Sequence, residues 1–503
     1  YYTEDGPVTF STNMLSVAAS LGSDLEIDRS FENFLLQHGF WPFGRTPYKG
    51  VVRVPARTIL ELRRDGTQRH PISCEDPWAE RYADVDLSSA TEAEVSQLLR
   101  EAFMRALEDQ LASDDKAAVL LGGFDSALVA SGLKELGKEV ETYSFFYDNP
   151  KYDQPHTDTV SRFLGTKHHW VAIDEAVMTD GLRRYAEFCN EPTCWPNYVI
   201  GTIALAGAMR EHGFDYCYSG DGCDATFFGY PLTYQRLRAV RKIRSLPAGL
   251  RQPIVSILEH PLADRFLGRP AHVGLGLLRG LELDEVTRQF LSLCILDESA
   301  LPNLRRGDQP TQAMEHSDIL RTLAAPHAAE DPVRLAYMGK ALISPTKAKI
   351  NGSTDRYGIS VFAPFTHLGM KHVAKRIPAT LIRPEEGGKK VEAIGKYILV
   401  RMAEDHKMLP EEVIHQKKVG AVDAPTDDWY AGPLRDVMLE SLGNLPFDSD
   451  PSYVERLLRP RLAEQMYAKA LARYTNNITT VTLAPSLLAT YGAFTSVGHQ
   501  ERA

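Results

Sequence analysis

Two short turns in this sequence combine glycines with aspartates in a way that suits phosphate chemistry. The first turn, Gly122-Gly123-Phe124-Asp125-Ser126, follows an apolar run that predicts a buried strand, and helical spacing resumes after it. Glycine lets backbone N–H groups approach phosphate oxygens, and the positive end of a helix favours negative charge there. Asp125 adds a carboxylate that can hold magnesium, although aspartate also commonly caps a helix such as the one starting at Ser126. The pattern favours a site for a phosphorylated ligand.

The second turn, Ser219-Gly220-Asp221-Gly222-Cys223-Asp224, follows another short apolar run, residues 214–218. It lies about 100 residues after the first turn, which suits two strands of a parallel sheet with helices between them. Ligands of such sheets bind beyond the carboxyl ends of the strands, so both turns can face one ligand. The aspartates of the two turns can therefore face the same ligand.

Both turns resemble the motifs of the asparagine synthetase family, in its ATP-pyrophosphatase synthetase domain. That family has Ser-Gly-Gly-x-Asp-Ser at the first turn and Gly-(Glu/Asp)-Gly-x-Asp-Glu-x-Phe-x-Gly-Tyr at the second. The similarity continues through Glu141-Thr-Tyr-Ser-Phe-Phe146, Asn190-Glu191-Pro192, Pro364-Phe365, Lys396 with Arg401, and Lys418-Val419-Gly420. The resemblance covers roughly residues 90 to 430.

The resemblance implies an α/β fold of the adenine-nucleotide alpha-hydrolase type, with a parallel sheet and helices on both of its faces. It also implies ATP and Mg²⁺ as cofactors, with Asp125 and Asp224 as the metal ligands. The residues expected to contact ATP belong to the two turns and to the strand after the first: Leu121, Gly122, Gly123, Asp125, Ser126, Ser144, Phe145, Gly220 and Gly222.

The chemistry implied by the resemblance is activation of a carboxylate. The carboxylate attacks the α-phosphorus of ATP to give an acyl-adenylate and pyrophosphate, and ammonia or an amine then takes the acyl group. A lysine near the acyl centre stabilises the developing charge, and the family's C-terminal lysine corresponds to Lys418, with Lys417 as the alternative. Asp221 occupies the family's acidic position near the attacking amine, as a general base, an orienting group or a turn-forming residue.

Four positions depart from the family pattern. Leu121 replaces the first serine of the phosphate turn, which removes a hydroxyl worth about 1–2 kcal/mol. Ala225 replaces the glutamate that follows the second aspartate, and Ser360 stands about where the family has a glutamate upstream of Pro-Phe. Asn13 replaces a glutamate of the first domain. These departures favour a substrate other than aspartate, either a small carboxylic acid or a peptide.

Three functions fit these residues. The first is an amidotransferase-type ligase that uses ammonia or glutamine-derived ammonia. The second is an intramolecular or amine-using amide synthetase, similar to the β-lactam synthetases and lasso-peptide cyclases. The third is a catalytically weakened homologue that acts as a binding or regulatory subunit.

The first 80 residues resemble the end of the family's N-terminal glutaminase domain, in which a cysteine hydrolyses glutamine. The chain begins without methionine in the middle of that domain, and no cysteine precedes Cys74. Either an upstream glutaminase half exists outside the numbered chain, or the glutaminase has been lost. We expect two domains, residues 1–80 and residues 90–503.

Hydrophobic periodicity predicts the elements around these motifs. We expect short strands in residues 1–80, a helix over Glu92–Leu111 and a β/α alternation over residues 117–229. Helices are expected over residues 232–344, a polar loop at Thr346–Asp355, and a helical, peripheral segment over roughly the last 60 residues. His168 and His169 are neighbours in a predicted strand and should point to opposite faces, so they should not share a metal ion.

Composition fits a globular enzyme, with 44% hydrophobic and 24% charged residues. A net charge of −10 argues against a nucleic-acid surface, and the basic residues of Arg236–Arg244 have the spacing of a solvated helix face. No apolar run reaches the ~18 residues of a membrane span, and no signal peptide is visible. Six cysteines are too few for a disulfide framework in a chain of this length, so we expect reduced thiols in a cytoplasmic protein, with homo-oligomerisation left open.

Overall fold

The computed structural model describes most of the chain, including both glycine turns and the sheet that carries them. The described residues are 1–4, 7–42, 44–55, 58–62, 69–73, 77–147, 155–227, 229, 242–259, 295–296, 301–305, 318, 345–382, 396–415, 425–449, 458 and 479–500. Most of the predicted helical region 232–344 lies outside these residues, as do Lys417 and Lys418.

The centre of the fold is a parallel sheet of five strands in the order β7-β6-β5-β8-β9. The strands are β5 (Lys116–Leu120), β6 (Glu139–Tyr147), β7 (Lys167–Ile173), β8 (Tyr216–Ser219) and β9 (Ser360–Phe362). After β5 the chain adds β6 and β7 on one side, and then β8 and β9 on the other. The order therefore reverses between β5 and β8, and α/β sheets bind ligands at the carboxyl ends beside such a reversal.

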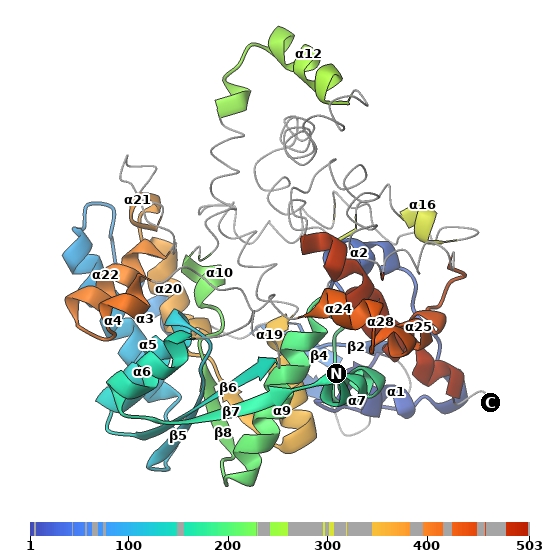
Figure 1. The fold of residues 1–503 in the computed structure, drawn as a ribbon, viewed down its shortest axis with the longest axis horizontal. Coiled ribbons are helices and arrows are strands. Elements are labelled where there is room, and N and C mark those ends of the chain that lie inside the picture. The colour runs from blue at the N-terminus through green and yellow to red at the C-terminus, as the bar shows by residue number, and fades with distance from the viewer. Residues whose placement is uncertain are drawn as a thin grey trace.

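Helices cover both faces of the sheet, which confirms the expected α/β fold (Figure 1). One face carries α5 (Phe124–Glu135), with α4 (Glu92–Asp109), α6 (Pro155–Leu164), α20 (Leu368–Arg376) and α22 (Tyr397–Asp405) around it. The other face carries α9 (Pro196–Glu211) and α19 (Pro345–Tyr357). The helix predicted over Glu92–Leu111 is α4, and Thr91 caps its start together with Glu94.

The central strand β5 is apolar on both sides because both faces are covered. Ala117 and Val119 are buried in the hydrophobic core that α5 shares, whereas Ala118 is buried with Tyr143 and the α9 residue Leu205. A strand buried on both faces reads as a continuous apolar run rather than an alternating one. This burial explains the run that precedes the first glycine turn.

The structure describes further helices outside these two layers. They are α3 (Pro77–Arg81), α7 (Glu175–Arg183), α8 (Tyr185–Phe188), α10 (Cys223–Phe227), α12 (Ala248–Glu259), α16 (Leu301–Leu304), α21 (Ala379–Ile382), α23 (Glu411–Ile414), α24 (Thr426–Ala431), α25 (Arg435–Gly443) and α28 (Thr479–Gln500), with the 3₁₀ turns Gly22–Asp24 and Pro364–Thr366.

The N-terminal segment is small and contains antiparallel pairs, as expected. β1 (Tyr2–Thr3) pairs with β2 (Val51–Val52), and β3 (Thr58–Leu62) pairs with β4 (Arg69–Ser73). The segment also contains α1 (Met14–Ala19) and α2 (Glu32–His38), which were not predicted. Their apolar side chains share hydrophobic clusters with α8, α9 and α28, so the segment packs directly on the rest of the chain.

Two predicted features are wrong. The polar stretch Thr346–Asp355 is not a loop but part of α19, where Gly352 lets the helix pack closely against α9. The C-terminal segment is not peripheral, because Leu487, Leu488 and Tyr491 of α28 are fully buried. In both cases tertiary packing decides the structure, and local polarity or position in the chain does not reveal it.

The two adjacent histidines of β7 point to opposite faces of the sheet, as predicted. His168 Nδ1 lies 2.9 Å from Thr142 Oγ1, on the face that carries α6. Burial lowers the pKa of His168 to about 4, so its ring is neutral at neutral pH. His169 instead stacks on Tyr143, on the face that carries α9.

The described cysteines Cys189, Cys194, Cys217 and Cys223 are buried and form no disulfide, in line with the expected free thiols. Among the described residues, no helix combines the length and the apolar character that a membrane crossing requires.

We expect Gly352→Val to destabilise the protein by about 1–3 kcal/mol, because overpacking a close helix contact forces neighbours to move. A Cβ on Gly352 would lie 2.5 Å from Ile203 Cδ1 and 3.3 Å from Cys189 Sγ. Gly249→Ala is the matched control, since Gly249 also lies in a helix but has open space around it. Urea unfolding of both variants checks the expectation, and equal stability of Gly352→Val and the wild type would contradict the packing argument.

Candidate active site

The two glycine turns lie side by side where the strand order reverses. The first turn follows β5 and the second follows β8, and these strands are hydrogen-bonded neighbours with Leu120 opposite Ser219. The turns approach so closely that a Cβ on Gly220 would lie 2.6 Å from the backbone nitrogen of Ser126 and 2.7 Å from Asp125 Cβ. Only glycine fits at residue 220, and the two motifs form a single site.

The first turn wraps around the hydroxyl of Ser126. The backbone N–H groups of Gly122 and Gly123 donate to Ser126 Oγ at 2.9 and 3.2 Å, and this hydroxyl donates to the carbonyl of Gly123 at 3.0 Å. A Cβ on Gly122 would meet no atom within 4 Å, so there is open space beside this turn. The space lies at the N-terminus of α5, where backbone N–H groups and the helix dipole favour an anion.

The side chain of Leu121 does not face this space. It is buried in the core shared with α5, and the backbone of Leu121 accepts a hydrogen bond from the hydroxyl of Ser144. Ser144 thus holds the start of the turn, while the neighbouring Phe145 lies against Gly201 and Tyr198 of α9. Of the predicted nucleotide contacts, Leu121 and Ser144 support the turn on its buried side and do not line the open space.

The second turn requires glycine for a conformational reason as well. Gly222 has φ of 87°, in the left-handed region that side chains disfavour, and a Cβ there would lie 2.6 Å from Thr366 Cγ2. The turn leads into α10, which carries Asp224 in its first turn. The backbone therefore sets Asp224 beside the first turn.

Asp125 and Asp224 come together around the ammonium group of Lys396. Lys396 Nζ contacts Asp125 Oδ1 and lies 2.5 Å from Asp224 Oδ1, and the lysine side chain is only 4% exposed. Burial by itself would lower the pKa of Lys396, but the two aspartates outweigh burial and raise it well above its usual value. A Cβ on Gly229 would overlap Asp224 Oδ1 and Lys396 Cε, so the glycine near the end of the second motif makes room for this ion pair.

Lys396 reaches the aspartates from an unusual backbone position. It lies directly before α22 with φ of 56° and ψ of 35°, a left-handed conformation that non-glycine residues seldom adopt. Such strain persists when surrounding contacts hold the residue in place, and it concentrates at functional sites.

A second buried lysine pairs with Asp221. Lys349 of α19 is 3% exposed at its side chain; it contacts Asp221 Oδ2 and donates to the Tyr198 hydroxyl at 2.9 Å. Although burial would lower the pKa of Lys349, Asp221 and Tyr198 raise it, so the lysine is charged. Asp221 also accepts a hydrogen bond of 2.7 Å from Ser219 Oγ.

The structure thus brings together most of the residues predicted from the two motifs, and it adds two lysines that sequence reasoning missed. In the sequence, Lys396 stands out only by its place in the C-terminal order of the motifs, and Lys349 lies in a stretch that is predicted to be a loop. No local pattern marks a lysine as buried between carboxylates that are far away in sequence. Lys417 and Lys418 lie outside the described residues, so Lys418 stays a prediction.

The structure also locates two of the positions that depart from the family pattern, Ala225 and Ser360. Ala225 is 3% exposed and follows Asp224 in α10. Ser360 is exposed and pairs with Tyr216, the first residue of β8, so it lies at the amino edge of the sheet and away from the turns.

A comparison with known families gives an independent result. The family model for asparagine synthase matches residues 98–488, which include both turns and most of the chain. None of the curated proteins matches the chain in sequence.

We expect Lys396→Met to reduce stability by about 3 kcal/mol, because it leaves two partly buried carboxylates next to each other without a counterion. Magnesium should restore part of the loss, and it should stabilise this variant more than the wild type. Urea unfolding with and without magnesium chloride measures both effects. Lys134→Met, which changes a lysine of α5 outside the cluster, is the control. A variant that unfolds like the wild type would show that the ion pair contributes nothing.

Proposed function

We propose that this chain, which belongs to the asparagine synthase family, adenylates a substrate carboxylate with ATP and transfers the acyl group to ammonia or an amine. Family membership makes it an ATP-dependent ligase of the amide-forming type. The observation that supports the more specific reaction is the cluster of Asp125, Lys396 and Asp224 beside the open Gly122 turn.

Asp125 and Asp224 fit a magnesium site. Two carboxylates that contact one ammonium already converge on the position of a single cation, and magnesium prefers such oxygen ligands together with phosphates. When bound, the ion would neutralise charge on the pyrophosphate group. Before nucleotide binds, Lys396 neutralises the two aspartates and keeps them in position.

In the first step an oxygen of the substrate carboxylate attacks the α-phosphorus of ATP. The bond from this phosphorus to the bridging oxygen of the β-phosphate breaks, so pyrophosphate leaves and the acyl-adenylate remains. The first turn and the N-terminus of α5 receive the phosphates, since Gly122 leaves space for them. Lys396 adds a fixed positive charge next to the leaving group, where charge stabilisation in a largely dry site is worth several kcal/mol.

In the second step the nitrogen of ammonia or an amine attacks the acyl carbon. The carbon–oxygen bond to AMP breaks, and the nitrogen releases a proton to solvent. Asp221 lies at the acidic position that the family uses near this nitrogen. Because Lys349 and Ser219 already hold its carboxylate, we assign Asp221 an orienting role, in which it keeps Lys349 at the site.

The expected binding site for the substrate acid differs from the family pattern. Ala225 supplies no carboxylate. Ser360 lies at the amino ends of the strands, whereas the turns follow the carboxyl ends. We therefore propose a carboxylic acid other than aspartate as the substrate. A screen of carboxylic acids for pyrophosphate release, with ammonium and with simple amines, identifies the acid and the donor together.

The spent nucleotide should be AMP with pyrophosphate in equal amounts, and not ADP with phosphate. The reason is the ATP-pyrophosphatase turn at residues 122–126, which replaces the Gly-Lys-Ser/Thr loop of kinases. Chromatography of a reaction with an accepted acid measures AMP, pyrophosphate, ADP and phosphate. Asp125→Asn is the control, and it should form neither AMP with pyrophosphate nor ADP with phosphate. Stoichiometric ADP would overturn the adenylation mechanism.

Lys418 should act in the chemistry and contribute little to ATP affinity. If its charge stabilises the transition state, Lys418→Met should lower turnover roughly 10²-fold with little change in nucleotide binding. Lys417→Met is the matched control, because it removes the same charge from the neighbouring residue. Loss of turnover only in the Lys417 variant would move the role to that lysine, and full activity of both variants would remove it from this segment.

A further inference from the structure

The α9 face of the sheet holds a cluster of polar side chains that the proposed reaction does not use. Glu141 and Tyr143 lie on β6, His169 lies on β7, and His212 directly follows α9. Glu141 and His169 are each the third residue of their strand, so they lie toward the amino ends, whereas both glycine turns follow carboxyl ends. The cluster is a separate place in the fold.

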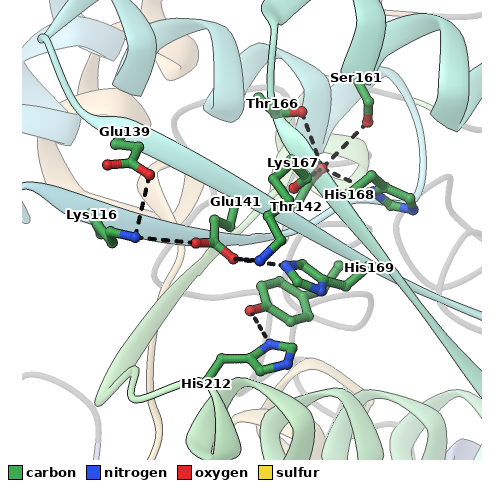
Figure 2. Close-up of polar contacts among 11 residues, drawn as sticks. Lys116, Glu139, Glu141, Thr142, Ser161, Thr166, Lys167, His168, His169 and His212 are labelled. Atoms are coloured by element: carbon green, nitrogen blue, oxygen red, sulfur yellow. Dashed lines mark hydrogen bonds and ion pairs between the residues drawn. The ribbon is translucent and has the colours of Figure 1, made fainter.

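Glu141 points toward His169, and His212 lies near both residues (Figure 2). Glu141 Oε2 lies 2.7 Å from His169 Nε2, and the rings of His169 and His212 are 4.5 Å apart between centroids. One nitrogen of each histidine and one oxygen of Glu141 lie within 4.8 Å of one another. Three elements of the fold therefore bring two imidazoles and a carboxylate to a common point.

Tyr143 holds both imidazole rings in place. Its ring stacks on His169 with centroids 4.5 Å apart and an interplanar angle of 12°, and its hydroxyl lies 2.8 Å from His212 Nδ1. A metal-bound histidine usually has a hydrogen-bond partner at its second ring nitrogen, which orients the ring and fixes its tautomer. The Tyr143 hydroxyl is such a partner for His212, whereas stacking on Tyr143 orients the ring of His169. The cluster thus has the supporting contact as well as the donors.

We propose that Glu141, His169 and His212 bind a divalent transition-metal ion of the zinc class. Zinc prefers imidazole nitrogen and carboxylate oxygen at about 2.0–2.2 Å, which places tetrahedral ligands roughly 3.4 Å from one another. The present separations, from 2.7 Å up to 4.8 Å, span that value, so small side-chain rotations are enough. Glu141 is buried and His212 is exposed, so the ion enters from the His212 side and water completes its shell.

Two lysines compete with the ion for Glu141. Lys116 Nζ lies 3.5 Å from Glu141 Oε1, and Lys167 Nζ lies 3.8 Å from Glu141 Oε2. Their positive charge opposes a second cation, which predicts moderate affinity. The side chain of Lys167 is 70% exposed, so its charge can be removed without disturbing the core.

A bound ion would join the edge strand β7 to its neighbour β6 and to the end of α9. The energy of metal binding then contributes to the stability of the folded chain. The site is structural in this proposal, and its occupancy does not depend on turnover.

Titration of the chelator-treated full chain tests the proposal. Zinc chloride, followed by calorimetry, and cobalt chloride, followed by absorbance, should each show one equivalent bound, and zinc should raise the temperature of unfolding. His212→Ala and His169→Gln should each weaken zinc binding 10-fold or more, whereas Lys167→Met should strengthen it. His406→Ala, which changes a histidine after α22, is the matched control and should bind zinc like the wild type.

Absence of saturable binding by the wild type would overturn the proposal, and so would wild-type affinity in His212→Ala. His212 is exposed, so its variant tests the site even if His169→Gln fails to fold. Because the isotherm is measured without ATP or substrate, this result is independent of the reaction proposed above.

Discussion

The ammonium of Lys396 is buried between the carboxylates of Asp125 and Asp224, and the arrangement of the candidate active site depends on this ion pair. Two partly buried aspartates repel each other, and a cation between them offsets this repulsion where the two turns meet. The lysine comes from the start of α22, so the pair also links the C-terminal half of the chain to the sheet. To reach that position, Lys396 adopts a left-handed backbone conformation. Residue 229 must be glycine, because a Cβ there would overlap the ion pair.

The reversal of strand order between β5 and β8 creates the place where this pair can form. Because β5 and β8 are parallel neighbours, the turns that follow them lie at the same end of the sheet. Gly220 has no side chain, so the backbones of the two turns can come into contact. The replacement of the family's serine by Leu121 fits this geometry, because the leucine side chain packs into the core and Ser144 secures the turn through the Leu121 carbonyl. The first turn therefore keeps its shape without that hydroxyl.

Two clusters of polar side chains with different chemistry lie toward opposite ends of the strands in this sheet. At the carboxyl ends, aspartates and buried lysines form a charged cluster beside the open space at Gly122. Toward the amino ends, imidazoles and one glutamate form a site that suits a softer cation. The adjacent residues His168 and His169 show how strand geometry makes this division, since the alternation of side chains sends one into the α6 face and the other into the α9 cluster.

The family, the α/β class and the two glycine turns could be predicted from the sequence, because they depend on local patterns: an apolar run buried on both faces, glycines where side chains cannot fit, and aspartates at fixed spacing. The sequence did not predict α19, whose polar residues form a helix that packs closely against α9 at Gly352. Nor did it determine the partners of Asp125 and Asp221, since Lys396 and Lys349 are more than a hundred residues away along the chain. Long-range charge pairing leaves no local periodicity in a sequence, so the lysines that complete the site can be identified only in the folded chain.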